Sequence, residues 1–255
     1  MTKIIILGSG SSLGSPWITN YWGNCKKKNL YNIRTRCSAF IKKNNLSILI
    51  DTSPDIKKQI LDNKIKEIDY VLYTHDHADQ TSGIFELRPF SWKKGGRINV
   101  YADKVTLKSL TKRYDYCFVG RKGYAPILKG NTVKKKFFLK KNKNKIYFES
   151  FQVNHGPIKS TAYIFNNSAY ISDCSGIEKK DLRKLLNLKY LIIDCLRINK
   201  HPTHFNLAEA INLSNILRPK KTVLTNLHTD LDYSYLKKNL PQNIIPAYDG
   251  MVIKT

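Results

Sequence analysis

The sequence predicts an α/β fold, of the α+β type, in which two mixed sheets pack face to face and helices cover their outer sides. Roughly a dozen short apolar runs with strand character alternate with helical segments, and helical segments occur in both halves of the chain. No repeat, low-complexity linker or charge boundary divides the sequence. We therefore expect residues 1–255 to form a single domain.

The predicted strands are short runs rich in β-branched and aromatic residues, bounded by polar or glycine-containing segments. They are Ile4–Leu7, Ser38–Ile41, Ser47–Ile50, Tyr70–Tyr73, Ile98–Tyr101, Lys136–Leu139, Ile146–Val153, Ala162–Phe165, Ala169–Ser172, Tyr190–Ile193, Thr222–Leu224 and Met251–Ile253.

Five segments have helical character: Pro54–Asn63, Lys104–Arg113, Glu178–Leu186, Leu207–Leu217 and Tyr233–Asn239. Pro54 and Asp55 suit the first turn of a helix, and we expect Ser53 to be its N-cap residue. Residues 207–217 carry a mostly apolar stripe at helical spacing, which indicates a helix packed against a sheet.

Composition limits the class of protein. With 42% hydrophobic and 25% charged residues, the chain can bury a substantial core. No apolar run approaches the roughly 20 residues that a membrane helix needs, and the first apolar segment is too short for a signal peptide. The five cysteines are scattered and odd in number, which argues against a disulfide framework. We expect a cytoplasmic protein with no membrane partner.

The net charge of +25 arises from 44 basic and 19 acidic residues. It allows an anionic partner, either nucleic acid or a phosphorylated substrate. The alternative is a compositional bias, because nearly all of the excess is lysine spread along the chain, and we favour this alternative. The densest run, from Lys134 to Lys145, predicts a solvated hairpin with its turn at Asn142 to Asn144.

One segment carries the strongest chemical signal. His75, His77 and Asp79 follow the predicted buried strand Tyr70–Tyr73 within a single turn. Imidazole suits zinc and other transition metals, and a carboxylate adds charge and a harder ligand. Since a rigid sheet fixes the loops at its strand ends, this segment predicts three candidate metal ligands.

The same arrangement recurs along the chain. Other predicted strands lead directly to polar residues that can bind a metal or support a ligand: Asp51, His155, Asp173, Asp194, and the pair Asn226 and His228. Each occurrence is a weak signal by itself. Together they predict a constellation, because side chains at neighbouring strand ends can converge on one point.

These motifs, in this order, resemble the metallo-β-lactamase superfamily of four-layer αββα hydrolases. The resemblance covers the whole chain and rests on the glycine-rich opening, the metal motif and the later strand ends: residues 7–16, 49–55, 75–80, 83–88, 154–155, 172–173 and 248–251. The chain is most similar to the phosphodiesterase branch that includes phosphoribosyl 1,2-cyclic phosphate phosphodiesterase. Ribonuclease Z is a more distant relative.

The resemblance implies one metal held by four residues, namely His75, His77, His155 and the bridging Asp173. It implies a second metal at Asp79 and Asp173, but the two histidines that complete this site in the family are replaced here by Gln80 and Asn226. His228 could replace Asn226, because alternate residues of an extended segment face the same side. We therefore expect Zn²⁺ or Mn²⁺, one or two per chain.

The resemblance also implies catalytic roles for Asp79 and His204. Asp79 would orient a metal-activated water, and His204 occupies the position of a proton donor to the leaving group, with a local hydrogen bond as the alternative. His201 is expected on the surface or behind the ligands. Asp51 and Asp249 are expected either to support the metal loop or to serve ordinary turns, and Asp194 is expected to be structural. Arg34, Arg36 and Arg88 could grip a phosphate or form internal contacts.

The predicted function is metal-dependent hydrolysis of a small (cyclic) phosphodiester through a metal-activated water. One alternative is a nuclease resembling ribonuclease Z, with nucleic acid as a less favoured partner. The other is a metal-binding homologue with an impaired second site. A homodimer is expected from the resemblance alone. The sequence does not identify the substrate or the metal.

Overall fold

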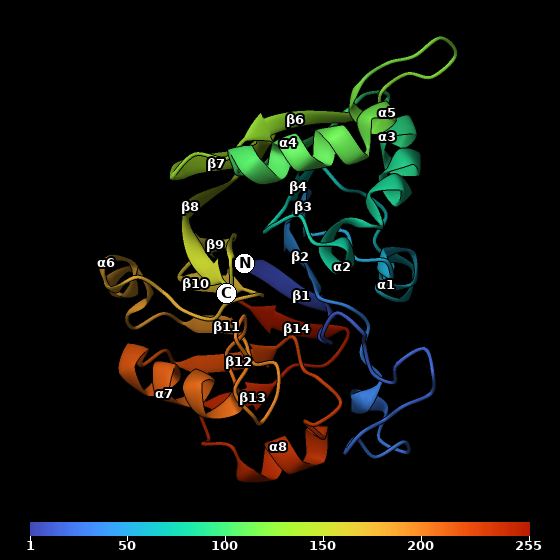
Figure 1. Cartoon of the computed structure of the whole chain (residues 1–255). Helices are drawn as coiled ribbons and strands as arrows, with labels where there is room; N and C mark the ends of the chain where they lie inside the picture. The colour runs from blue at the N-terminus through green and yellow to red at the C-terminus, as the bar shows by residue number, and fades with distance from the viewer.

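Two seven-stranded sheets face each other in the computed structural model, which describes residues 1–255, and helices cover both outer sides (Figure 1). The first sheet has the order β14 (Met251–Lys254), β1 (Thr2–Gly8), β2 (Ser38–Lys43), β3 (Leu46–Ile50), β4 (Tyr70–Leu72), β5 (Ile98–Ala102) and β6 (Leu128–Thr132). The second has the order β13 (Ile244–Pro246), β12 (Lys221–Thr225), β11 (Tyr190–Asp194), β10 (Ser168–Ile171), β9 (Ile158–Phe165), β8 (Asn144–His155) and β7 (Lys136–Lys141). The predicted fold class is confirmed.

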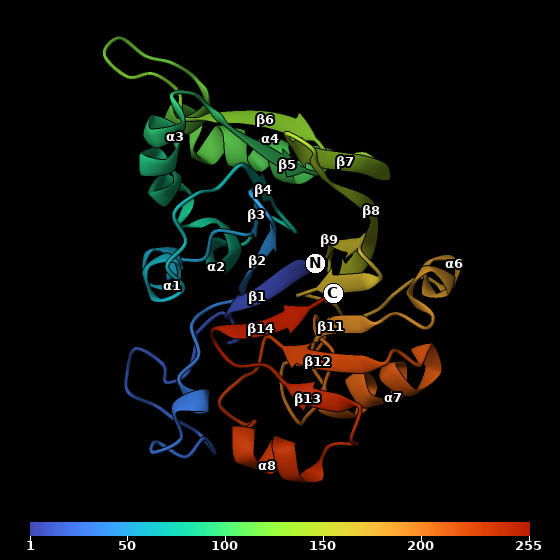
Figure 2. The same ribbon diagram turned by 180° about the vertical axis from the view of Figure 1, so that it is seen from behind.

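Helices form two groups, one for each sheet. Those of the first group are α1 (Ile56–Asp62), α2 (Ala78–Thr81), α3 (Arg88–Lys94), α4 (Lys104–Arg113) and α5 (Asp115–Phe118), and those of the second are α6 (Lys179–Leu182), α7 (Leu207–Leu217) and α8 (Tyr233–Asn239). Short 3₁₀ turns occur at Leu30–Asn32, Ile84–Leu87 and Arg183–Leu185. Figure 2 shows α3 and α4 at one end of the molecule and α7 and α8 at the other.

The two sheets bury a shared apolar layer. Alternate residues of the first sheet, such as Ile4 and Ile48, pack with residues of the second, such as Phe165 and Ile192, and each is at most 2% exposed. Two further cores join each sheet to its own helices. Because strand side chains alternate between faces, each sheet buries both sides, which produces the four layers.

The predicted strands and four of the five predicted helices are present, and Glu178–Leu186 forms the short helix α6 and a 3₁₀ turn instead of one helix. Each of the twelve predicted strands lies within or largely overlaps an observed strand, and three helices, α4, α7 and α8, have the predicted bounds. Two edge strands were missed. Gly130 interrupts the β pattern of β6, and β13 is only three residues long and ends at Pro246.

The predicted N-cap of α1 is wrong. Asp55 is the N-cap residue of α1, and the Ser53 hydroxyl instead accepts a hydrogen bond from the Asp55 amide, at 3.2 Å. The Asp55 carboxylate pairs with Arg36, whose Nε lies 3.1 Å from Oδ2. Because this ion pair uses the carboxylate, it makes no capping bond to its own helix.

Parallel strands bring the metal-binding residues together. β3, β4 and β5 run parallel in the first sheet, and β10, β11 and β12 do so in the second. The residues after β4, β10 and β12, together with the last residues of β11 and β8, therefore meet at one end of the sandwich. This edge is where chemistry is expected in an open α/β sheet.

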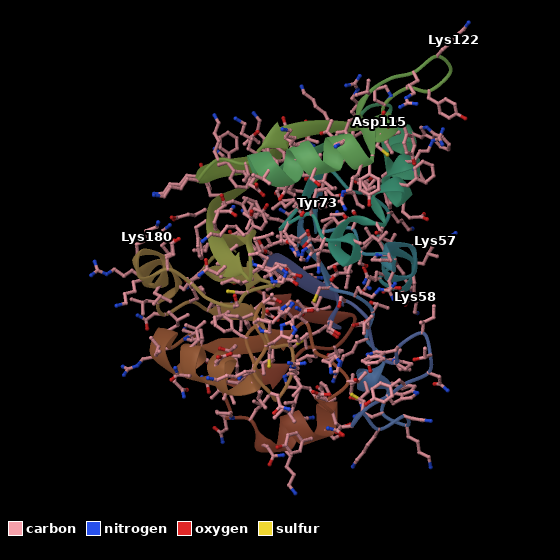
Figure 3. All side chains as sticks on the ribbon, in the orientation of Figure 1. Lys57, Lys58, Tyr73, Asp115, Lys122 and Lys180 are labelled. Atoms are coloured by element: carbon pink, nitrogen blue, oxygen red, sulfur yellow. The ribbon has the colours of Figure 1, made fainter.

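The lysine residues lie at the surface and on many elements. Figure 3 shows Lys122, Lys180 and the neighbouring pair Lys57 and Lys58 of α1 in different parts of the outline, whereas Tyr73 is inside. The predicted hairpin forms between β7 and β8, with Asn142 in the left-handed conformation at the turn. All five cysteines are buried and none forms a disulfide. None of the helices has the length and apolar character needed to cross a membrane.

Two neighbouring residues of β14 provide a test of the sandwich. Ile253 is 3% exposed and packs between the sheets, whereas Val252 is 50% exposed. We expect Ile253→Ala to lower the free energy of unfolding by about 2–5 kcal/mol, because it leaves a cavity. The matched variant Val252→Ala should cost about 0.5 kcal/mol or less. Urea unfolding monitored by tryptophan fluorescence measures both, and equal losses would contradict the burial of only one face of this strand.

Candidate metal centre

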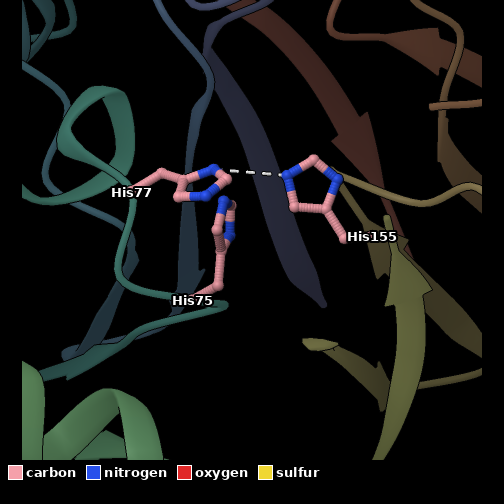
Figure 4. Close-up of side chains that lie close together, drawn as sticks. All are labelled: His75, His77 and His155. Atoms are coloured by element: carbon pink, nitrogen blue, oxygen red, sulfur yellow. Dashed lines mark hydrogen bonds between the residues drawn. The ribbon is translucent and has the colours of Figure 1, made fainter. Parts of the chain in front are cut away.

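Three histidines from distant segments converge at the strand ends. His75 and His77 follow β4, and His155 is the last residue of β8. Their ring centroids lie 4.6 to 5.0 Å apart, and one nitrogen of each ring lies within 4.8 Å of the others (Figure 4). Nδ1 of His77 is 3.2 Å from Nε2 of His155. Three imidazole nitrogens at this spacing are a typical set of ligands for a divalent metal.

Contacts behind the rings orient two of them. Nδ1 of His155 donates to the backbone carbonyl of Thr203, at 2.7 Å. Nδ1 of His75 donates to the Thr74 hydroxyl, at 3.0 Å, and this hydroxyl in turn donates to Asp51, at 2.8 Å. Since each Nδ1 carries the proton, each Nε2 presents a lone pair. Asp51 thus supports the metal loop through Thr74.

Gly156 allows the loop that carries Thr203, the residue that orients His155, to pack closely against the end of β8. It has a φ of +59°, and a Cβ placed there would lie 2.3 Å from the Cγ2 atom of Thr203. A residue with a side chain would both strain the backbone and displace Thr203. The hydrogen bond between Thr203 and His155 therefore depends on glycine at this position.

His75 is uncharged at neutral pH. Its pKa is lowered to about 4, mainly by burial; Asp173 opposes this shift, and the neighbouring His155 and His77 add to it. Its Nε2 is buried and has no hydrogen-bond partner. A buried, neutral imidazole with a free lone pair fits a metal ligand, because an unpaired buried polar atom is otherwise costly.

Asp173, which follows β10, is a fourth candidate ligand. The residue is 2% exposed, and its Oδ1 lies 3.9 Å from Nε2 of His155. Although burial would raise its pKa, attraction to His75, His204 and His155 lowers it. Asp173 is therefore a charged carboxylate next to the histidine cluster, which it reaches through His155. A carboxylate beside imidazole nitrogens fits a ligand of a divalent cation.

His204 lies beside His155, with their ring centroids 4.7 Å apart. It forms a second possible ligand group with His155 and Asp173, but its Nδ1 is 2.8 Å from Oδ2 of Asp194, the last residue of β11. Burial alone would lower the pKa of His204; the charge and hydrogen bond of Asp194, with Asp173, raise it to about 9. His204 thus carries a proton at neutral pH. Asp194 is the partner that sequence reasoning did not assign, although its position at a strand end was the available signal.

The remaining motif residues form a hydrogen-bonded group around Asp173. Nε2 of Gln80 donates to Asp79, at 3.2 Å, and to Asp173, at 3.3 Å. Nδ2 of Asn226 donates to Asp194, at 3.0 Å, and to Asp173, at 3.4 Å. Asp79 is therefore linked to the centre through Gln80 and lies outside both ligand groups.

His228 does not take the place of Asn226. Its Nδ1 lies 3.0 Å from Asp230, its ring is edge-on to Trp17, and it belongs to neither ligand group. The prediction assumed that alternate residues of an extended segment face the same side. Asn226 instead has a φ of +63°, so the alternation is broken and His228 points away.

The other candidate residues, three arginines and Asp249, make contacts with other side chains and backbone groups of the protein. Arg34 is 2% exposed and donates to the carbonyl groups of His228 and Leu231. Arg36 pairs with Asp55, and the Arg88 guanidinium lies over the rings of Phe85, Trp92 and Tyr124. Asp249 accepts hydrogen bonds from Ser9 and Thr35, and so ties the glycine-rich loop to β14.

A four-layer αββα sandwich with histidine and aspartate ligands at its strand ends defines a class of metal-dependent hydrolases. The family model of the beta-lactamase superfamily domain matches residues 47–226. The chain belongs to the metallo-β-lactamase superfamily, as its motifs predict, and this fold usually binds divalent metals.

Two solved structures have the same fold. A structure described as a new diphosphatase from the PhnP family has 30% identity and a TM-score of 0.90, over 99% of this chain and 96% of that one. Zn²⁺-bound PqqB from Methylobacterium extorquens has 16% identity and a TM-score of 0.79, over 99% and 100% of the two chains, which shows the fold alone.

An octanoyltransferase of Porphyromonas gingivalis is 31% identical over 255 residues, which are 98% of this chain. The chain covers 51% of that protein, so it spans about half the length of the curated relative it matches.

The contact between Thr74 and His75 can be tested by metal affinity. Thr74→Val keeps the shape of the side chain but removes the hydroxyl that accepts the His75 proton. We expect metal affinity to fall about 10- to 100-fold, the usual effect of removing such a contact. Thr74→Ser retains the hydroxyl and should bind nearly as the parent. Competition with a chromogenic chelator measures both, and equal affinity in Thr74→Val would show that the contact does not position His75.

Proposed function

We propose that this protein is a metal-dependent phosphodiesterase that acts on a small phosphodiester. The observation that carries the proposal is the pair of His204 and Asp194, placed beside the histidine cluster so that a proton donor and a metal site face the same space. Hydrolysis of a phosphodiester needs both, because charge builds on the phosphate and on the departing oxygen.

In the proposed hydrolysis, the metal-binding residues and Asp79 have different roles. A divalent cation held by His75, His77, His155 and Asp173 would supply the positive charge that activates water and neutralises phosphate oxygens. Asp79 is partly exposed and fixed by Gln80, a position suited to accept a hydrogen bond from the attacking water. Each role is supported by the contacts of these side chains.

His204 is suited to protonate the leaving group. Its Nδ1 is committed to Asp194, which leaves Nε2 as the only ring nitrogen that can donate to a substrate. The buried Asp194 holds the ring in one orientation and favours its charged form. This arrangement resembles a carboxylate–histidine pair that works as a general acid.

A diphosphate is a second candidate substrate class. The likeness to a structure described as a diphosphatase favours it, since cleavage of a diphosphate needs the same charge neutralisation. The two classes differ in the leaving group, because a departing phosphate needs a proton less than a departing alkoxide does.

Acyl transfer by this domain is less well supported. A thiol that carries an acyl group needs exposure and a lowered pKa. Here burial raises the pKa of all five cysteines, and each is at most 4% exposed. We therefore do not propose octanoyl transfer as the activity of this chain, which covers about half of the octanoyltransferase.

The first assay compares substrate classes on the metal-loaded protein. We expect hydrolysis of bis(p-nitrophenyl) phosphate with Mn²⁺ or Zn²⁺ and none after chelation. A mixed diester, a dinucleoside diphosphate and a short RNA should then be compared at two salt concentrations. Preference for RNA with steep salt dependence would favour a nuclease. Bound metal without hydrolysis of any substrate would overturn the proposal and favour a non-catalytic binder.

His204→Gln tests the proton donor through the leaving group. For an alkyl ester, which needs protonation, we expect kcat to fall about 10²- to 10⁴-fold. For a p-nitrophenyl ester, whose leaving group is stable as an anion, the loss should be much smaller. A structural role would lower both rates equally, and that result would remove His204 from the proposed chemistry.

The pH profile gives an independent test. With the pKa of His204 raised to about 9, the donor is charged below that value and loses its proton above it. For the alkyl ester we expect kcat/KM to fall as the pH rises through about 9. In Asp194→Asn the fall should begin at lower pH, because the charge that stabilises the imidazolium is gone. An unchanged alkaline limb in this variant would contradict the assignment.

A further inference from the structure

The position of a second metal in this site is filled by hydrogen-bond donors. Between the two carboxylates of Asp79 and Asp173 lies Nε2 of Gln80, 3.2 and 3.3 Å from their oxygens. On the other side of Asp173, Nδ2 of Asn226 donates to Oδ1. Each Asp173 oxygen is thus approached by a neutral N–H group where a second cation would have to approach it.

The donor set does not fit a second transition metal. Apart from the histidines, the side chains hydrogen-bonded to Asp173 are the amides of Gln80 and Asn226, and Asp79 is reached through Gln80. An amide oxygen is a weak neutral ligand. His204 could supply an imidazole, but its Nδ1 is committed to Asp194. His228 is directed to Asp230.

The amides cannot become ligands without loss. To offer oxygen to a cation, each amide would have to rotate, so that its carbonyl replaces its NH₂ group. For Asn226 this breaks the bonds to Asp194 and Asp173 and places lone pairs against two buried carboxylates, which is costly. For Gln80 it breaks the bonds to Asp79 and Asp173, and the Oε1 atom of Gln80 is buried without a partner in the present orientation. The carboxylate of Asp173, which is almost fully buried, would also lose both of its amide donors.

We propose that the protein binds one divalent metal per chain, and that Gln80 and Asn226 replace the second metal by donating hydrogen bonds to Asp173. In this arrangement the amides keep Asp173 charged and oriented toward the histidine cluster. The inference deepens the proposed function, with which it shares the metal centre. Its test is the number of metals bound, which does not depend on turnover.

The experiment titrates the untagged, chelator-stripped full chain with Zn²⁺, and separately with Mn²⁺, by calorimetry, and checks the dialysed protein by elemental mass spectrometry. One tight equivalent per chain with each metal is expected. Mn²⁺ should give the spectrum of an isolated ion by electron paramagnetic resonance, not that of a coupled pair. Two tight equivalents, a coupled spectrum, or no tight site would overturn the inference.

A gain-of-site variant tests the role of the amides. Gln80→His with Asn226→His should bind a second equivalent, because two imidazoles then face Asp79 and Asp173. The matched control places the same changes on the surface, at Gln242 and Asn239, and should still bind one. Should the double variant fail to fold by circular dichroism, each single variant is titrated instead. A folded double variant that still binds one metal would overturn the role given to the amides.

The outcome is separable from that of the proposed function. A protein with one metal that hydrolyses no phosphate ester keeps this inference and loses the phosphodiesterase. Active protein with two metals does the reverse. The count of metals and the rate of hydrolysis therefore decide different statements about the same site.

Discussion

The buried negative charge of Asp173 organises the candidate metal centre of this protein. A charge that is almost fully buried is tolerated only when it is paired and hydrogen-bonded. The imidazoles of His75, His155 and His204 supply the attraction that lowers the pKa of this carboxyl despite burial. Amide donors complete its shell. The groups needed to stabilise one charge are therefore the groups that define the site.

The sandwich keeps the conformational entropy cost of this convergence small. Each residue is held at the end of a strand whose both faces are buried, so little freedom remains to be lost when a ligand binds. Parallel pairing places the ends of β10, β11 and β12 side by side, and β4 contributes from the facing sheet. The loops behind the histidines add fixed acceptors, of which the Thr203 carbonyl is the clearest.

The site combines two kinds of positive charge. One is the charge of the cation that the three histidines would bind. The other is the charge of the His204 imidazolium, which is hydrogen-bonded to Asp194. In a centre with two metals, a second cation would share the work of charge neutralisation. Here a proton-carrying ring and two amides stand near the same carboxylate. The overall charge of +25 is spread over lysines on the outer surface and does not form part of this arrangement.

The sequence by itself determined the layers and the place of the candidate ligands. Apolar alternation identifies buried strands, and His75, His77, His155 and Asp173 each follow or end one, whereas their predicted role as ligands came from the family resemblance. Only the tertiary structure decided which of these side chains contact one another. That Asp194 pairs with His204, and that His228 turns away because Asn226 adopts a left-handed conformation, depends on backbone geometry and contacts between segments distant in sequence. Periodicity carries no information about either.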